Sequence, residues 1–342
     1  MAGATKDLVD ERTTVVTLAR LAGVAASTVS RALKGDPRIS AATRRRIGAL
    51  ATERGYTPNA LARTLSSGHS GLIGLVLGPI ENPFYSELMQ EAVSQAASRG
   101  LRLLLLHVGA GAMEDSTAQA LLQYQVDGCL ITSAELSSHA ARICAAHNVP
   151  VVMVNRVPRL HASAIACDNF QGGQDMAEYL LGGGHRSFAI IRGNPDSSTS
   201  IERERGFAER LAAQGIDPPL RIEGGSTYDG GFAAGRMFAE MPKDRRPDAI
   251  FAVADIMAMG VIDAFRIAGI KVPDDISVAG FDGIAQAARP IYGVTTVAQP
   301  VASMVRRGFD LLTARIGNSA QPDEVVLLRG ALVVRQSVRR PA

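Results

Sequence analysis

Apolar runs of four to six residues alternate with amphipathic stretches along most of this chain, and no other feature limits its fold so strongly. The strand candidates lie at 72–77, 101–106, 128–132, 150–154, 188–192, 220–223, 249–253 and 276–281. Helix candidates fill the gaps, at 85–99, 114–125, 136–147, 171–182, 202–214, 229–240 and 256–268. Strands that are apolar on both faces and alternate with helices form parallel sheets covered on both sides. The sequence therefore predicts two doubly wound α/β lobes in tandem.

Length and composition are those of a globular protein with more than one domain. At 342 residues, with 46% hydrophobic and 20% charged residues, the chain is too long for one ordinary core. No apolar run reaches the ~18 residues of a membrane span, and the first residues lack the apolar region of a secretory signal. We therefore expect a cytoplasmic protein with no membrane partner.

The net charge of +3 is unevenly distributed. Residues 1–70 hold 11 Lys and Arg against 5 Asp and Glu, a net +6, whereas the remainder holds 25 against 28, a net −3. A basic head on a mildly acidic body suggests a polyanionic partner for the head alone. A solvated helix surface is the alternative explanation of this charge.

The segment 17–33, TLARLAGVAASTVSRAL, is typical of a helix, a tight turn and a second helix. Ala19, Gly23 and Val29 have the spacing of a helix-turn-helix. The small Ala19 lets the helices cross closely, Gly23 can adopt the positive φ of a sharp turn, and Val29 fills the space between the helices. An ordinary helical hairpin with a polar face is the alternative.

The second of these helices turns short polar groups and one guanidinium outward, which suits insertion into a DNA major groove. Arg31 can bond O6 and N7 of a guanine, whereas Ala26 offers only a methyl contact and Ser27 discriminates weakly. Contacts to phosphate fix the position of the protein along the DNA but do not discriminate between bases. The hydroxyl groups expected to make them are those of Thr14, Thr28, Ser30 and Ser40.

A third helix is predicted from about Ser40 to Arg54. Ser40 is a plausible N-cap, and Ile47 and Leu50 lie on its apolar stripe. Three arginines at 44–46 follow the start of this helix. Since a run of charge is usually a solvated face, we assign none of them to DNA.

Four motifs in order resemble the lactose-repressor (LacI/GalR) family of transcriptional regulators: LARLAGV at 18–24, STVSRAL at 27–33, ISxxTR at 39–44 and GYTPNALARTL at 55–65. The resemblance implies an all-α helix-turn-helix head plus a hinge helix, followed by a two-lobed core like that of periplasmic binding proteins. It also places Tyr56 among the residues that bind DNA. Ala25 departs from the family's usual serine, which puts one DNA contact in doubt.

The resemblance extends to a hinge helix and linker at 59–69. It implies that the hinge folds on DNA, paired with its twin in the minor groove, where Leu65 wedges between base steps. Asn59 then contacts phosphate, and Ala62 permits a close approach to the groove. A helix of about two turns is marginal alone, so a flexible tether is the alternative.

Further family motifs recur in the body, including DNFQGG at 168–173, RxxGF at 203–207 and VPDDISVAGFD at 272–282. They imply a small-molecule effector bound between the lobes, at the carboxyl ends of the strands. Arg203 matches the arginine that grips ligand oxygens through its fork of donors, and Asp282 matches a carboxylate that accepts ligand hydroxyls. The other effector-binding candidates are Phe84, Tyr85, Asn155, Arg156 and Asp255.

Two departures from the family bear on the identity of the effector. Asn155 stands where an aspartate is commoner, and Ala254 replaces the usual asparagine before Asp255. The sequence therefore favours a sugar derivative over a simple hexose as the effector. Arg156 and Arg203 would tolerate the negative charge of a sugar acid or a sugar phosphate. Each residue also has a structural alternative: Asp255 as a helix N-cap, and Asp282 as a turn residue.

Two other classes of protein share folds of this kind. The sequence has no Walker-type loop, no nucleophile elbow, no metal cluster and no Rossmann fingerprint after the first strand, so we expect neither an enzyme nor a cofactor. His185 is expected at the surface or as a helix cap. A transport binding protein would have a signal peptide and no basic head. Buried free thiols are expected at Cys129, Cys144 and Cys167.

A single head makes few base contacts, so useful affinity needs two heads on a two-fold site. We therefore expect a homodimeric repressor on palindromic double-stranded DNA. The same architecture is compatible with an effector that releases the protein from DNA and with one that recruits it to DNA.

The expected domains follow from these assignments. A flexible tail at 1–13 precedes the head at 14–58 and the hinge and linker at 59–69. The core spans 70–342, with a first lobe at about 70–167 and a second at about 168–298. The last strands and a helix at 301–316 are expected to return to the first lobe.

Overall fold

The chain divides into two compact units, Met1–Ser70 and Gly71–Ala342. The computed structural model describes residues 13–56, 69–78, 80–108, 112–132, 135–157, 162–318 and 321–339. The predicted hinge contacts at Asn59, Ala62 and Leu65 lie outside these residues.

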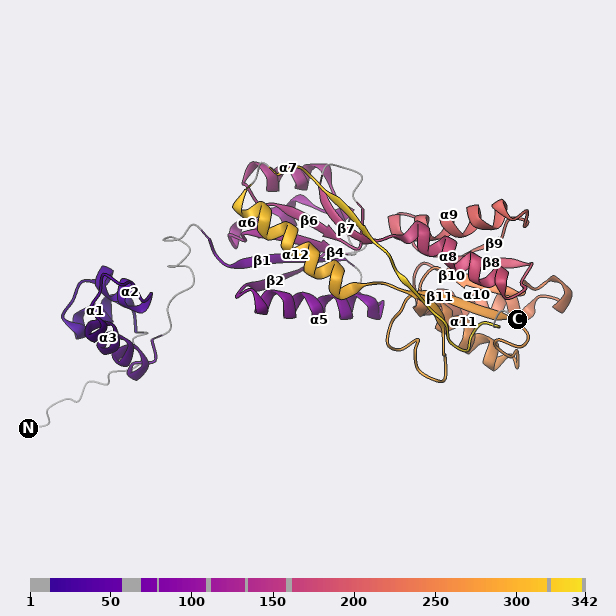
Figure 1. Cartoon of the computed structure of the whole chain (residues 1–342), viewed down its shortest axis with the longest axis horizontal. Coiled ribbons are helices and arrows are strands. Elements are labelled where there is room, and N and C mark those ends of the chain that lie inside the picture. The colour runs from indigo at the N-terminus through magenta and orange to yellow at the C-terminus, as the bar shows by residue number, and fades with distance from the viewer. Residues whose placement is uncertain are drawn as a thin grey trace, which may run out of the picture. The chain divides into compact units, whose positions relative to one another are not determined.

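The described part of the first unit is a small helical head (Figure 1). Its helices are α1 (Val15–Ala22), α2 (Ala26–Leu33) and α3 (Ala41–Glu53). Leu18, Val29 and Ile47, one from each helix, are fully buried in its core. Gly23 ends α1 with a φ of 60°, a conformation open to glycine at little cost. The helix-turn-helix predicted at 17–33 is thus confirmed.

Two of the three arginines at 44–46 brace this head. Arg44 Nη1 donates to the carbonyl oxygens of Asp36 and Ile39 at 3.0 and 2.8 Å. Arg46 Nη2 donates to the carbonyl oxygen of Ala22, at the end of α1, at 2.9 Å. These bonds reach carbonyl oxygens at the end of α1 and in the turn between α2 and α3, where helices leave acceptors without intrahelical partners. Arg45 and Arg46 are exposed, as expected of a solvated face, and only Arg44 is half-buried.

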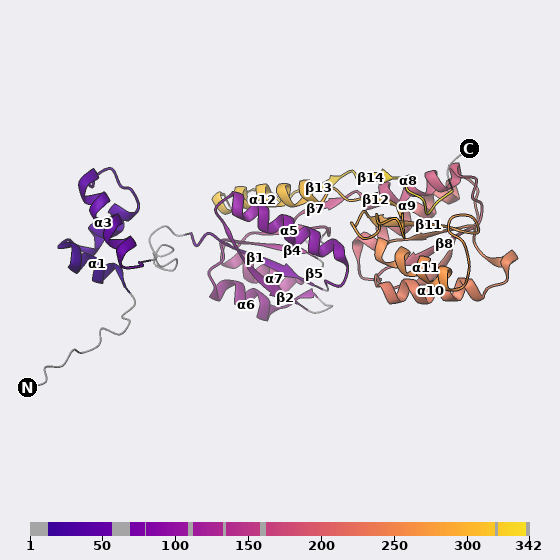
Figure 2. The same ribbon diagram turned by 90° about the horizontal axis from the view of Figure 1, so that it is seen from below.

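Two largely parallel sheets form the core of the second unit (Figures 1 and 2). The first has the order β13 (Val325–Leu328), β7 (Ser163–Cys167), β6 (Val151–Val154), β4 (Gly128–Thr132), β1 (Leu72–Leu77) and β2 (Arg102–His107). The second has the order β14 (Ala331–Val333), β12 (Thr295–Ala298), β11 (Ser277–Asp282), β10 (Ala249–Ala252), β8 (Phe188–Arg192) and β9 (Leu220–Glu223). The short strands β3 (Ala112–Met113) and β5 (Glu135–Leu136) pair separately.

Helices cover both faces of each sheet, as Figure 2 shows. On the first sheet, α5 (Pro83–Ser98) and α12 (Val301–Gly317) lie opposite α6 (Asp115–Gln123) and α7 (Ser138–Ala146). On the second, α8 (Asn169–Gly182) and α9 (Ser198–Ala213) lie opposite α10 (Tyr228–Glu240) and α11 (Asp255–Ile267). Because helices cover both faces, central strands such as β4 and β11 are buried along their whole length. The predicted pair of doubly wound lobes is confirmed.

The chain crosses between the lobes after β7, after β12 and after β13. Helix α12 packs on the first sheet, and β13 pairs with β7 there. Strand β14, however, pairs antiparallel with β12 in the second sheet. The expectation that the last strands return to the first lobe was therefore wrong for β14, which instead covers the edge of β12 that would otherwise lack a partner.

His185 is a buried helix cap. Its Nδ1 lies 2.8 Å from the carbonyl oxygen of Leu180, in the last turn of α8, and its Nε2 lies 2.8 Å from Ser277 Oγ in β11. A carbonyl can only accept, so Nδ1 carries the proton and Nε2 accepts from the serine. Burial lowers the pKa of His185, which favours this neutral form. The capping role predicted for it is confirmed, and the surface position was wrong.

The three cysteines are buried and free, as predicted. Burial raises the pKa of the thiols of Cys129, Cys144 and Cys167, which makes them poor nucleophiles. Among the described helices, none has the length and apolar character needed to cross a membrane.

Gly206 sets the distance between α9 and α8. A Cβ at this position would lie 2.0 Å from the carbonyl oxygen of Phe170. We expect Gly206→Ala to lower the free energy of unfolding by about 1–3 kcal/mol or more, because the helices must move apart. Gly317→Ala is the matched control, since its Cβ would meet nothing within 4 Å. Urea unfolding measures both, and equal stability of the two variants would contradict this packing.

Candidate functional site

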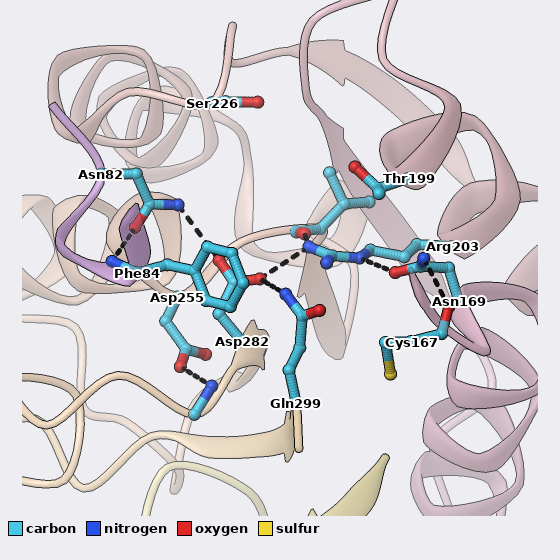
Figure 3. A network of polar contacts seen from close by, with 12 residues as sticks. Asn82, Phe84, Cys167, Asn169, Thr199, Arg203, Ser226, Asp255, Asp282 and Gln299 are labelled. Atoms are coloured by element: carbon cyan, nitrogen blue, oxygen red, sulfur yellow. Dashed lines mark hydrogen bonds and ion pairs between the residues drawn. The ribbon is translucent and has the colours of Figure 1, made fainter. Parts of the chain in front are cut away.

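Polar side chains gather where the carboxyl ends of strands from both sheets meet (Figure 3). Asn82 and Asn155 follow β1 and β6 of the first sheet, whereas Asp282 and Gln299 end or follow β11 and β12 of the second. Arg203 joins them from α9, which follows β8. Because ligands of doubly wound folds bind at the carboxyl ends of the strands, we call these five residues the inter-lobe cluster.

Arg203 is held rigidly at the centre of this cluster. Its Nε donates to Asn169 Oδ1 at 2.8 Å, and its Nη1 donates to the carbonyl oxygen of Val253 at 2.7 Å and to Asp282 Oδ1 at 2.9 Å. The guanidinium carbon lies 3.8 Å from the centre of the Phe281 ring, a cation–π contact. Among the described residues, Nη2 has no acceptor. One donor of a fixed fork is thus left for another molecule.

Asp282 receives hydrogen bonds from both lobes. Its Oδ1 accepts from Arg203 and from Gln299 Nε2, the latter at 2.8 Å, and its Oδ2 accepts from Asn82 Nδ2 at 3.1 Å. Its φ of 120° is rare for a residue with a side chain and costs on the order of 1–3 kcal/mol. The three donors hold the carboxylate in this conformation, so Asp282 is more than a turn residue.

A second hydrogen bond joins the lobes beside Asp282. The backbone amide of Ala285 donates to Glu87 Oε1, on α5, at 3.1 Å. The loop after β11 therefore contacts the first lobe through two carboxylates, Asp282 and Glu87. A ligand that competes for either carboxylate changes the contact between the lobes.

Asp255 supports the site from beneath. It is fully buried, and its Oδ2 accepts from the backbone amides of Gly283 and Ile284 at 2.7 and 3.0 Å. It is the first residue of α11, and Ala254 occupies the N-cap position. The N-cap alternative was therefore wrong, since the carboxylate fixes the loop that follows Asp282. Its Oδ1 has no partner among the described residues, and its role as a ligand group stays a prediction.

The two aromatic candidates differ in exposure. Phe84 is 2% exposed and belongs to the apolar core of the first lobe. Tyr85 is half-buried and meets Phe84 edge to face, with ring centres 5.3 Å apart. Burial raises the pKa of the Tyr85 hydroxyl, and the nearby Arg156 guanidinium opposes that rise. Tyr85 is therefore the aromatic side chain with surface left for a ligand.

Several polar atoms of this region are buried without a partner among the described residues. They are Thr132 Oγ1, Asn155 Oδ1, Arg156 Nε and Gln299 Oε1. Asn155 has a φ of 74°, which an asparagine tolerates better than most residues. Buried polar groups are normally satisfied, so this concentration of unsatisfied donors and acceptors is suited to a ligand rich in oxygen.

Two hydroxyl groups at the start of α9 also belong to this region and were not predicted from the sequence. Ser197 and Thr199 are buried, and their hydroxyl oxygens lie 2.8 Å apart. Thr199 precedes Arg203 by one helical turn, so both lie on one face of α9. The signal was the run of serine and threonine at 197–200, directly before the arginine.

The head presents a separate set of polar groups. On α2, Ser27 and Arg31 are exposed, and Thr28 and Ser30 are half-buried. Ala26 and Tyr56 are half-buried and pack against the apolar core of the head. The side chains of Thr14 and Ser40 cap α1 and α3 by accepting from the amides of Thr17 and Thr43.

Comparison with known proteins gives a consistent result for both units. Residues 15–59 match the bacterial regulatory proteins of the lacI family. Residues 177–338 match the periplasmic binding protein-like domain.

Similar proteins of full length are known. The ribose operon repressor of Escherichia coli is 32% identical over 329 residues, which are 95% of this chain and 99% of the repressor. A lac repressor dimer bound to operator and the anti-inducer ONPF superposes with a TM-score of 0.87 at 26% identity, over 96% of this chain and 99% of that one. A CelR–cellobiose complex gives a TM-score of 0.69 at 30% identity, over 95% and 100% of the two chains.

The buried carboxyl of Asp255 makes the stability of the protein depend on pH. Burial, and then the charge of Asp282, raise its pKa to about 8, against 3.8 for an ordinary aspartate. The folded state therefore binds this proton more tightly than the unfolded state, and the resulting stabilisation is lost as the pH rises from about 4 to about 8. Asp255→Asn keeps an acceptor for both amides but does not titrate.

We accordingly expect the wild-type protein to lose stability relative to Asp255→Asn between pH 5 and pH 8. Urea unfolding of both proteins at several pH values gives the difference. A difference that stayed constant, or that changed in the opposite direction, would contradict the buried, protonated carboxyl.

Proposed function

Since the chain belongs to the LacI family of bacterial transcriptional regulators, we propose that a small molecule bound at the inter-lobe cluster controls how its head binds a palindromic operator. The protein is a DNA-binding transcriptional regulator and not an enzyme. The observation that carries the proposal is the cluster itself, in which unsatisfied buried polar atoms surround a fixed guanidinium and a strained carboxylate. Operator DNA lies in the cytoplasm, where we propose that the protein acts.

The effector is proposed to be a sugar or sugar derivative. Asp282, Arg203 and Thr199 provide the acceptors and donors that hydroxyl groups need, and Tyr85 offers an aromatic face. The CelR–cellobiose complex supports this class of ligand by its name, and so does the ribose operon repressor. We retain Asn155, Arg156 and Asp255 as ligand groups, whereas Phe84 acts through packing.

The head is proposed to read DNA through the exposed face of α2. Arg31 has no hydrogen-bond acceptor among the described residues and lies at the surface, so its guanidinium is available for a guanine. Ser27, Thr28 and Ser30 share that face, with Ala26 at its start, while Thr14, Ser40 and Tyr56 flank it. The proposed boundaries remain 14–58 for the head and 59–69 for the hinge and linker, with Asn59, Ala62 and Leu65 as hinge contacts.

The regulator is proposed to act as a homodimeric repressor. Two heads on a two-fold operator double the base contacts of one, and the matched lac repressor is a dimer on its operator. Exposed apolar side chains on the core, such as Val93, Ile267 and Ile291 at 53%, 78% and 59% exposure, offer surface for a second copy.

Control by the effector is proposed to be a shift between arrangements of the lobes. The hydrogen bonds from Asn82 to Asp282 and from Ala285 to Glu87 join the lobes beside the cluster. A ligand that binds one arrangement better than another shifts the population toward it. Changing the separation of the two heads then changes operator affinity without any contact between ligand and DNA.

Arg31→Ala tests the assignment of the reading face. We expect loss of discrimination at one base of each half-site, worth about 1–3 kcal/mol. Selection of binding sites from random duplex DNA measures this, with Arg245→Ala, an exposed arginine of the core, as the control. An unchanged site profile for Arg31→Ala would refute its role.

Thr199→Val tests the effector site, because it removes a buried hydroxyl and keeps the shape of the side chain. A thermal-shift screen of sugars, sugar acids and nucleosides first identifies a stabilising compound. Operator binding by fluorescence anisotropy should then respond to that compound in the wild-type protein and in Thr313→Val, an exposed control on α12. In Thr199→Val the response should need at least about tenfold more compound, and a normal response would argue against the site.

A further inference from the structure

The two arginines of the inter-lobe region differ in their partners. Arg203 and Asp282 neutralise each other, since they form an ion pair at 2.9 Å and their side chains are 5% and 3% exposed. Asp255, directly beneath, contributes no full negative charge at neutral pH, because burial and the neighbouring Asp282 raise its pKa to about 8. The remaining charged group of the candidate set is Arg156.

Arg156 has no carboxylate partner among the described side chains. Its Nε is enclosed by protein and makes no hydrogen bond there. Its neighbour Asn155, which directly follows β6 in a left-handed conformation, is an uncharged amide. Glu87, the other carboxylate at the junction of the lobes, bonds the backbone of Ala285. Arg203 is therefore paired with a carboxylate, whereas the guanidinium of Arg156 has an enclosed donor and no ion pair with a described carboxylate.

The position of Arg156 relates this unpartnered guanidinium to the ligand site. Its guanidinium lies near the Tyr85 hydroxyl, whose pKa it lowers against the effect of burial, and Arg203 and Asp282 act on the same hydroxyl. Arg156, Arg203 and Asp282 are thus all close enough to the Tyr85 hydroxyl to influence its charge. An enclosed N–H without an acceptor is costly, and a planar guanidinium binds carboxylate or phosphate oxygens in pairs.

We propose that the effector carries an anionic group, a carboxylate or a phosphate, which binds Arg156 while the hydroxyl-bearing part of the same molecule binds Asp282, Arg203 and Thr199. The proposal rests on the proposed function, since it names the class of ligand for the same site. A neutral sugar would satisfy the hydroxyl-binding side and leave the guanidinium of Arg156 without an anionic acceptor.

Matched ligands test the proposal on the full-length protein. Isothermal titration calorimetry compares glucose with glucuronate and glucose 6-phosphate, galactose with galacturonate and galactose 6-phosphate, and ribose with ribose 5-phosphate. Inorganic phosphate and acetate control for binding of the anion alone. We expect at least one anionic sugar to bind at least tenfold more tightly than its neutral partner. Whether the sugar acid or the sugar phosphate binds more tightly then identifies the anionic group.

Arg156→Gln assigns the effect to this residue. It should weaken binding of the anionic sugar at least tenfold and leave the affinity for the neutral partner unchanged, whereas Arg236→Gln, an exposed arginine of α10, should change neither. Thermal melting shows that both variants are folded. The proposal would be overturned if no anionic sugar bound, or if neutral sugars bound as tightly as their anionic partners. It would also be overturned if Arg156→Gln bound the anionic sugar with wild-type affinity.

The failure of this inference is distinguishable from failure of the proposed function. A neutral sugar that changes operator affinity through Thr199 would leave the proposed function in place and exclude the anionic ligand. A ligand that binds the core tightly and never changes operator affinity would count against the proposed function instead.

Discussion

The buried ion pair between Arg203 and Asp282 is the constraint on which the rest of the core depends. Removing two charges from water is costly, and their attraction offsets that cost only when further hydrogen bonds satisfy the remaining atoms. Asn169, Gln299 and Asn82 supply such bonds, and Asp255 fixes the loop that follows Asp282. A pair so fully supported is a rigid, preorganised set of donors and acceptors at the point where the two sheets meet.

Because Asp282 also accepts from Asn82, the ligand site and the contact between the lobes share one carboxylate. A ligand hydroxyl that takes a lone pair of Asp282 competes with that contact. Binding and lobe arrangement are then linked thermodynamically, and a regulator needs this linkage between its effector and its DNA. The buried network therefore makes the site rigid. It also includes a hydrogen bond between the lobes that a ligand can replace.

The sequence predicted those features that depend on local periodicity. Gly23 and Val29 indicated the helix-turn-helix, and the apolar runs indicated both sheets. It failed where distant contacts decide the structure. Helix α9 begins at Ser198 rather than near 202, because a run of serine and threonine is typical of caps and loops. The support that Asp255 gives to the 283–284 loop and the pairing of β14 with β12 depend on neighbours far along the chain.

Ligand binding at the inter-lobe cluster and operator binding by the head are coupled in one protein, and a binding cycle measures that coupling. The affinity of a stabilising ligand is determined by calorimetry with and without saturating operator DNA, and the affinity for operator is determined with and without saturating ligand. We expect the two affinities to change by the same factor, roughly 5- to 150-fold. A ligand that binds the cluster with equal affinity in the presence and absence of operator would contradict it.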